Sequence, residues 1–307
     1  SNSVTDDLDF SPFAEPSSYV ASLNGAPIFS VSYEREELGR ITKKTETIES
    51  DGPVETFYRY DPAGRLWRVC EDESCTAIRA EYLYDDNGNR EVGSFSESGG
   101  SVLSATYDEQ DRLTTHTTTA GITDFVYTAN GELAEKTVGS ETTRYTYDAL
   151  GNLRHVELPD GTEIDYLVDG RNRRVGKKVD GELVRQWLWD GRLRVVAELD
   201  GAGDLVSQFV YGTKRNVPGY MIKNGMRYRI ISDHLGSPRL VVDVATGDVA
   251  QRTDFDEFGN VVTDTMPGFH PFGFAGGLYD PNTGLVRFGV RDYDPRTAGW
   301  TRKDPLG

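Results

Sequence analysis

The sequence predicts an all-β fold, in which repeated β-hairpins form a spiralling antiparallel sheet, a shell or partial barrel, capped by a C-terminal core. Two observations support this prediction. A short phrase, made of an aromatic residue, one further residue, Tyr-Asp and a tight turn ending in Gly, returns along the chain. Self-similarity of this kind indicates an array of supersecondary units. No long stretch has apolar residues at three-to-four spacing, so we expect helix to be scarce.

Residues 1–26 come first and are predicted to form an N-terminal arm or a loosely paired first strand. The segment has mixed polarity and includes Pro12 and Pro16. It opens without a basic region followed by an apolar stretch, so we expect no signal peptide in this chain, which could be a fragment of a longer protein.

Residues 27–225 are predicted to be the hairpin array. The clearest copies of the phrase begin at Tyr58, Tyr82 and Tyr145, and degenerate copies lie between them. The aromatic residue before each turn recurs at intervals of 19 to 27 residues, at Tyr33, Tyr60, Tyr84, Tyr107, Tyr127, Tyr147, Tyr166, Trp189 and Tyr211. Because a lone hairpin is marginal in water, neighbouring hairpins must pair edge to edge.

Each copy has the chemistry of a hairpin. Residues two apart point to the same face of a strand, so Tyr58 and Tyr60 form an aromatic pair on one side. Asp61-Pro62-Ala63-Gly64 has the residues that a type I turn prefers. Gly can also adopt positive φ without steric cost. We therefore assign structural repeat roles to Tyr60, Asp61, Gly64, Tyr84, Asp85, Gly88, Tyr147, Asp148 and Gly151.

The two cysteines, Cys70 and Cys75, are separated by four residues, which matches neither the CxxC redox motif nor a zinc motif. They fall at an expected hairpin tip. Two readings remain open: a disulfide, which needs an oxidising compartment, or two free thiols. The four histidines are scattered, so we expect no metal site and no cofactor.

The charge balance restricts the partners. The chain has 33 basic and 50 acidic residues, a net charge of −17. Nucleic acids and anionic membrane surfaces attract basic proteins, so neither is an expected partner. No apolar run is long enough to span a bilayer, so no membrane insertion is expected.

From about residue 226 to 307 the periodic hairpins give way to a different block. It contains Ser232-Asp233-His234-Leu235-Gly236, then Gly277-Leu278-Tyr279-Asp280-Pro281, and ends with Asp304-Pro305-Leu306-Gly307. The hairpin phrases resemble the YD repeats of rearrangement-hotspot (Rhs) proteins. This final block resembles the Rhs repeat-associated core that follows them, truncated after its first Asp-Pro-x-Gly motif.

The resemblance implies a hollow shell of hairpins with the core as a plug. In this family, the shell holds a variable toxic C-terminal segment. Bacterial polymorphic toxins and the C subunit of insecticidal toxin complexes use such shells, and teneurins use a similar one for adhesion. The implied partners are the chain's own C-terminal toxin, which would lie beyond Gly307, and a secretion-machinery or toxin-complex protein. The implied location is secreted or at the cell surface.

The resemblance also implies self-cleavage of the aspartic-protease type. The matching residues are Arg291 and Asp304, and the second aspartate of the motif would lie beyond Gly307. Aspartic proteolysis needs two carboxylates that share a proton, so we expect this site to be incomplete. The alternative is a structural ion pair or turn contact. We predict that the Asp-Pro pairs at Asp61, Asp280 and Asp294 are turns.

Three functions therefore follow as hypotheses. The first is a structural module that encloses and delivers a toxin. The second is a self-cleaving aspartic-type peptidase core that is inactive in this form. The third is an adhesion or carbohydrate-binding surface of exposed aromatic residues such as Trp300.

Overall fold

The computed structural model describes residues 4–95, 102–212 and 214–303. The chain divides into two compact units, residues 1–122 and 123–307. Each unit is described separately.

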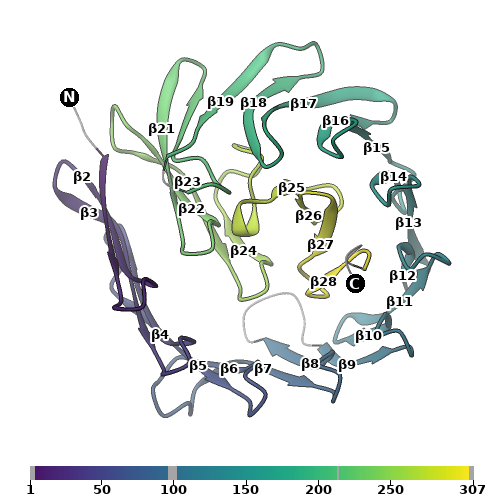
Figure 1. The fold of residues 1–307 in the computed structure, drawn as a ribbon, viewed down its shortest axis with the longest axis horizontal. Helices are drawn as coiled ribbons and strands as arrows, with labels where there is room; N and C mark the ends of the chain where they lie inside the picture. The colour runs from purple at the N-terminus through teal and green to yellow at the C-terminus, as the bar shows by residue number, and fades with distance from the viewer. Residues whose placement is uncertain (1–3, 96–101, 213, 304–307) are drawn as a thin grey trace. The chain divides into compact units, whose positions relative to one another are not determined.

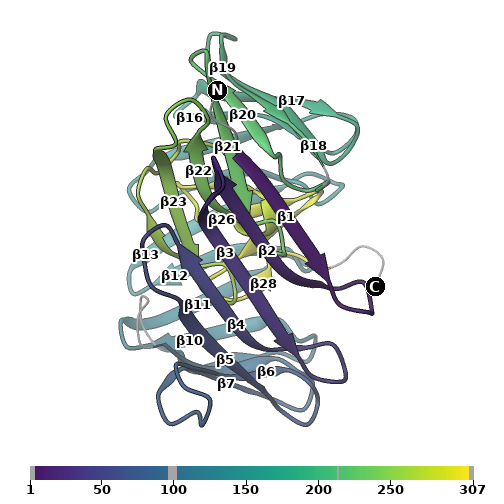
Figure 2. The same ribbon diagram turned by 90° about the vertical axis from the view of Figure 1, so that its left-hand side faces the viewer.

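The first unit is an antiparallel sheet in which each strand pairs with the next along the chain. Figure 2 shows its first strands side by side. The strands are β1 (Val4–Phe10), β2 (Pro16–Leu23), β3 (Ala26–Arg35), β4 (Ile41–Ile48), β5 (Val54–Tyr60), β6 (Leu66–Cys70), β7 (Ile78–Tyr84), β8 (Arg90–Phe95), β9 (Val102–Tyr107) and β10 (Leu113–Thr118). The segment predicted as an N-terminal arm thus holds β1 and β2, which are regular members of the sheet. The domain boundaries at 26/27 and 225/226 remain predictions.

The second unit continues the same pattern and adds a smaller sheet. Its hairpin strands are β11 (Gly121–Tyr127), β12 (Leu133–Val138), β13 (Glu141–Tyr147), β14 (Leu153–Glu157), β15 (Glu163–Val168), β16 (Arg174–Val179), β17 (Glu182–Asp190), β18 (Arg194–Asp200), β19 (Leu205–Val210), β20 (Tyr220–Lys223), β21 (Met226–Ser232), β22 (Pro238–Asp243), β23 (Val249–Phe255) and β24 (Val261–Asp264). The smaller sheet has β25 (Leu278–Asp280), β26 (Leu285–Phe288), β27 (Arg291–Asp294) and β28 (Gly299–Trp300). We call residues 278–303 the C-terminal block. In Figure 1 it lies beside the strands of its own unit.

The described residues contain no α-helix, only a 3-10 turn at Phe274–Gly276. The prediction of an antiparallel, all-β hairpin fold is therefore confirmed. Within the described ranges, no helix is long and apolar enough to cross a membrane.

The turns show why the Asp and Gly of the phrase recur. The carboxylate of Asp61 accepts the backbone N–H of Arg65 at 2.9 Å. The N–H of Gly64 donates to the Asp61 carbonyl at 2.9 Å. Gly64 has φ of 85°, Gly88 of 92° and Gly151 of 73°, in the left-handed region that favours glycine. Asp85 and Asp148 accept from their own turns in the same way.

At five positions of the series, the aromatic residue before the turn ties its hairpin to the preceding one. Its hydroxyl or indole N–H donates to a backbone carbonyl at the start of the preceding return strand. The bonds are Tyr60 to Ile41 (2.7 Å), Tyr84 to Leu66 (2.8 Å), Tyr107 to Arg90 (2.8 Å), Trp189 to Arg174 (2.8 Å) and Tyr211 to Val195 (3.1 Å). Burial raises the pKa of Tyr107 to about 12, so its hydroxyl keeps the proton that it donates.

We predict that Tyr84→Phe lowers the free energy of unfolding by about 1 kcal/mol, because it leaves the Leu66 carbonyl without its donor. Urea unfolding measures the change. The control is Tyr220→Phe, whose side chain is 38% exposed, and which should cost less than about 0.5 kcal/mol. Equal effects of the two substitutions would contradict the structural role of this bond.

An apolar core in the second unit joins hairpin strands to residues 272–278, which reach the first residue of the C-terminal block. Its buried members include Trp187, Phe209 and Met221 from the hairpins, with Phe272 and Leu278 from the later segment. The rings of Phe209 and Phe272 meet edge to face, with centroids 4.8 Å apart. Burying each large side chain contributes about 1.5–3 kcal/mol, so this core anchors residues 272–278 to the hairpins.

Cys70 and Cys75 are joined as a disulfide in the turn between β6 and β7, with their Cα atoms 5.1 Å apart. Next to it, Asp72 accepts the backbone N–H groups of Thr76 and Ala77. The Ser74 hydroxyl also bonds Asp72, and these bonds hold the pKa of Asp72 well below its usual range. The turn is thus held by a covalent bond and by a charged hydrogen-bond acceptor.

Candidate functional site

Only one of the two residues predicted to be catalytic lies in the described part of the chain. Arg291 begins β27, and its guanidinium lies 4.1 Å from the centre of the Trp300 ring. Asp304 lies outside the described residues. The assignment of Arg291 and Asp304 to self-cleavage therefore stays a prediction.

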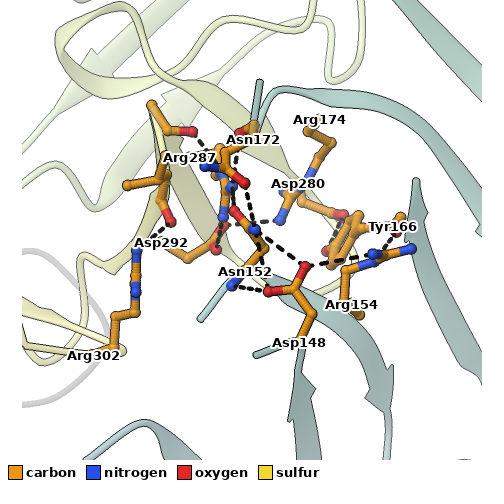
Figure 3. Close-up of polar contacts among 12 residues, drawn as sticks. Asp148, Asn152, Arg154, Tyr166, Asn172, Arg174, Asp280, Arg287, Asp292 and Arg302 are labelled. Atoms are coloured by element: carbon orange, nitrogen blue, oxygen red, sulfur yellow. Dashed lines mark hydrogen bonds and ion pairs between the residues drawn. The ribbon is translucent and has the colours of Figure 1, made fainter. Parts of the chain in front are cut away.

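The structure instead brings together a buried polar network between the hairpins and the C-terminal block (Figure 3). The hairpins contribute Asn152, Tyr166, Arg174 and Lys177, and the block contributes Asp280, Arg287 and Asp292. We call these seven residues the docking network. Its bonds link residues more than 100 positions apart in the sequence.

Asp280, at the end of β25, is one centre of the network. One carboxylate oxygen accepts the Tyr166 hydroxyl at 2.5 Å, and the other accepts the Lys177 ammonium at 2.6 Å. Lys177 also donates to the side-chain oxygen of Asn282 at 2.7 Å. Burial and the neighbouring Asp280 charge raise the pKa of Tyr166 well above its ordinary value, so its hydroxyl acts as a donor.

Asp292, in β27, is the second centre. It accepts from Arg174 at 3.0 Å on one oxygen and from Arg287 at 2.8 Å on the other. All three side chains are at most 2% exposed. Arg174 also lies over the ring of Tyr166, 3.5 Å from its centre. The carboxylate thus holds two buried guanidiniums together, one from each side of the interface.

The turn beginning at Asp148 forms the third contact. Asp148 accepts from the side-chain amide of Asn152, which turns the Asn152 carbonyl oxygen toward Arg287, 2.9 Å from Nη2. The Arg302 side chain packs against Gly151. Glycine is favoured at this position because its φ of 73° lies in the left-handed region.

The prediction that Asp280 and Asp294 act as turn residues is incomplete. Both do accept backbone N–H groups of their own turns, from Asn282 and Arg296. Asp294 is also buried against Lys136, 2.9 Å away, on β12. Burial alone would raise the pKa of Asp294, but the Lys136 charge lowers it below its ordinary value. Each aspartate therefore closes a turn and binds a hairpin cation.

Two of the repeat aromatics, Tyr147 and Tyr166, do not make the hydrogen bond to a backbone carbonyl of the preceding hairpin. Tyr166 donates to Asp280 of the block instead. The buried hydroxyl of Tyr147 lies near the Thr301 side chain, without hydrogen-bond geometry to any described residue. The repeat chemistry is thus modified in the hairpins that meet the C-terminal block.

The arrangement of charges in the docking network suits attachment of the C-terminal block to the hairpins. Asp280 and Asp292 each neutralise buried cations, so neither is placed to share a proton with a second carboxylate, as aspartic proteolysis requires. Among the described residues, no group of three or more His, Cys, Asp or Glu could hold a metal ion. Breaking a buried ion pair is costly, so the network fixes one position of the block on the hairpins.

Sequence reasoning missed the cationic half of the network. Arg174 and Lys177 lie in β16, and both are buried. Their signal is a pair of basic dipeptides, Arg173-Arg174 and Lys177-Lys178, at the start of β16 and within it, in an otherwise acidic chain. Such dipeptides are usually solvent-exposed, so the pattern alone does not identify buried partners.

Comparison with known proteins identifies a family model that matches nearly the whole chain. The model described as the teneurin YD-shell matches residues 3–306. Mouse teneurin-3 is 28% identical over 283 residues, covering 90% of this chain and 10% of that protein. The tRNA3(Ser)-specific nuclease WapA of Bacillus spizizenii is 27% identical over 250 residues, covering 79% of this chain and 10% of that protein. The chain thus spans about a tenth of the length of these relatives.

Among solved structures, the crystal structure of TcdB2-TccC3-TEV has a TM-score of 0.64 at 15% identity, covering 99% of this chain and 18% of that one. The crystal structure of TcdB2-TccC3 has a TM-score of 0.58 at 15% identity, with coverages of 98% and 20%. These likenesses show the fold. The match of the family model over nearly the whole chain shows that this protein belongs to the teneurin YD-shell family.

Proposed function

We propose that this chain is the wall and plug of a YD shell that encloses and delivers a polypeptide attached after the C-terminal block. The docking network is the observation that supports the proposal most directly. It seats the block on the hairpins through buried charges, and it uses hairpin positions that depart from the repeat. Such a seat holds the block in one position on the hairpins, as a plug requires.

Enclosure works by denying the attached polypeptide access to proteases and targets. The similarity to the WapA nuclease and to TcdB2-TccC3 assemblies is in keeping with a toxin-bearing protein. The disulfide between Cys70 and Cys75 fits a protein that works outside a reducing cytosol.

The test is protease protection. A natural polypeptide that continues past residue 307 is digested with trypsin, beside the isolated downstream segment. Under the proposal, the attached segment is cut at least about tenfold more slowly than the isolated segment, because protected cleavage requires prior opening. Equal cleavage rates would refute enclosure.

Self-cleavage is tested separately. The natural polypeptide and its Asp304→Asn variant are compared on a gel without added protease. Equal processing of the two proteins would show that Asp304 has no catalytic role.

The carbohydrate-binding alternative is less favoured by the geometry. Trp300 is 42% exposed, but its ring packs edge-on against Phe288 and Tyr293, with centroids 5.7 and 5.5 Å away. Arg291 covers it as well. An aromatic residue that packs against three neighbours inside the block serves the block's own stability.

A further inference from the structure

An amine, a carboxylate and a primary amide meet where the hairpins contact the turn after β25. The side-chain nitrogen of Lys177 lies 2.6 Å from Oδ1 of Asp280 and 2.7 Å from Oδ1 of Asn282. Lys177 belongs to β16, whereas Asp280 ends β25 and Asn282 follows in the next turn. An amine and an amide can join covalently where a neighbouring acid–base group moves the protons.

The amine and the carboxylate are held away from water. The side chain of Lys177 is 7% exposed and that of Asp280 is 5% exposed. Burial makes charged groups costly, so it favours the exchange of one proton that turns this ion pair into a neutral amine and a neutral acid. Asn282 is exposed, so a small leaving group can pass from it directly to solvent.

The carboxylate of Asp280 is fixed by partners on both of its oxygens. Tyr166 donates to Oδ2 at 2.5 Å, and Oδ1 accepts the backbone N–H of Asn282 at 2.9 Å as well as the Lys177 amine. Because an amide C=O bond is about 1.23 Å long, Nζ of Lys177 lies at most about 3.9 Å from Cγ of Asn282. Reacting atoms in near-attack conformers are about 3–3.5 Å apart, so a small rotation of the Asn282 side chain is sufficient.

We propose that Lys177 and Asn282 form an intramolecular isopeptide bond, with Asp280 as the proton carrier. Asp280 takes one proton from the Lys177 ammonium, and the free Nζ forms a bond to Cγ of Asn282. The bond between Cγ and Nδ2 breaks, and Nδ2 leaves as ammonia with a second proton from Nζ. The third proton stays on the new amide, and Asp280 keeps the proton that it took. No further reactant is needed, and no unpaired charge is left buried.

The bond joins β16 to the turn after β25, so it attaches the C-terminal block to the hairpins covalently. Amines attack amides slowly when the two are free in solution. Holding the two groups in contact raises their effective concentration, which is what the folded docking network provides. The inference goes beyond enclosure and does not depend on it.

The test is intact-mass spectrometry of the whole chain, denatured after incubation of the folded protein near neutral pH. We expect a mass lower than that of the sequence by one molecule of ammonia. Succinimide formation at an Asn-Gly pair such as Asn87-Gly88 also releases ammonia, so a tryptic digest locates the loss. The isopeptide bond blocks cleavage after Lys177 and gives a branched peptide that contains Lys177 and Asn282. A succinimide leaves Lys177 cleavable.

Three variants separate the proposed bond from other modifications. Asn282→Ser removes the amide at an exposed position, so the variant should fold, and it should give no branched peptide. Lys177→Arg keeps a cation for Asp280 but has no nucleophilic amine, and should give the same result. Lys178→Arg, the matched control in the same strand, should keep the branched peptide in full.

Complete cleavage after Lys177 in the incubated, unsubstituted chain would overturn the proposal and leave an ordinary hydrogen bond. A branched peptide that persists in Asn282→Ser would overturn it as well. The protease-protection assay follows a different segment of the chain, so either result can fail without the other.

Discussion

Asp292→Ala should destabilise the second unit by about 3–5 kcal/mol, because it leaves the guanidiniums of Arg174 and Arg287 buried without their shared carboxylate. The loss should act first on the C-terminal block, which Asp292 joins to β16. Urea unfolding measures the free energy. Limited proteolysis, followed by mass spectrometry, shows whether residues 278–303 become cleavable first.

Two matched variants sharpen this result. Asp190→Ala removes a carboxylate that is 68% exposed and 3.8 Å from Arg194, and should cost less than about 0.5 kcal/mol. Replacing all three charges, with Arg174→Met, Arg287→Met and Asp292→Leu together, should recover much of the loss, since apolar residues can replace a buried ion cluster. If Asp292→Ala costs no more than Asp190→Ala, the docking network does not hold the block.

Acidification should destabilise the protein by about 3 kcal/mol between pH 6.5 and pH 4, through His270 alone. Burial, aided by the Lys223 charge, lowers the pKa of His270 from its ordinary 6.5 to about 4. The folded protein therefore holds the ring neutral, while the unfolded chain takes up a proton below pH 6.5. This contribution to stability is complete above pH 6.5 and is lost as the pH falls toward 4.

Urea unfolding at a series of pH values measures this dependence. In His270→Gln, which keeps an acceptor for the Phe272 N–H but does not titrate, the decline between pH 6.5 and pH 5 should largely disappear, because carboxylates with lowered pKa values, such as Asp294, lose stability only nearer pH 4. NMR titration of the His270 ring gives its pKa directly. A ring that titrates near pH 6.5 in the folded protein would contradict the prediction.

The hairpin array was predictable because its information is local. Asp61 and Gly64 lie within four residues of each other, and turn chemistry acts over that distance. Tyr84 could likewise be assigned to the sheet from its spacing to Tyr82. The acceptor of its hydroxyl, 18 residues earlier, could be identified only from the structure.

The docking network could not be predicted, because its pairs are distant in sequence. Asp280 and Lys177 are 103 residues apart, and nothing local marks either as the partner of the other. Asp280 was correctly predicted to be a turn residue. Its second role, as the acceptor for Tyr166 and Lys177, depends on tertiary contacts that the local sequence does not reveal. Arg291 and Asp304 were proposed from family resemblance, and their chemistry awaits the gel assay.

The tyrosine-to-carbonyl tie has a consequence for how such proteins evolve. Each tie uses one side chain and a backbone oxygen of the preceding hairpin, and every residue at that position, proline included, presents a carbonyl oxygen. Gene duplication can therefore add or delete a whole hairpin without inventing a compatible partner sequence. The hairpins that contact the C-terminal block, among them those that carry Tyr147 and Tyr166, should resist such changes, since they must stay compatible with residues encoded in a distant part of the gene.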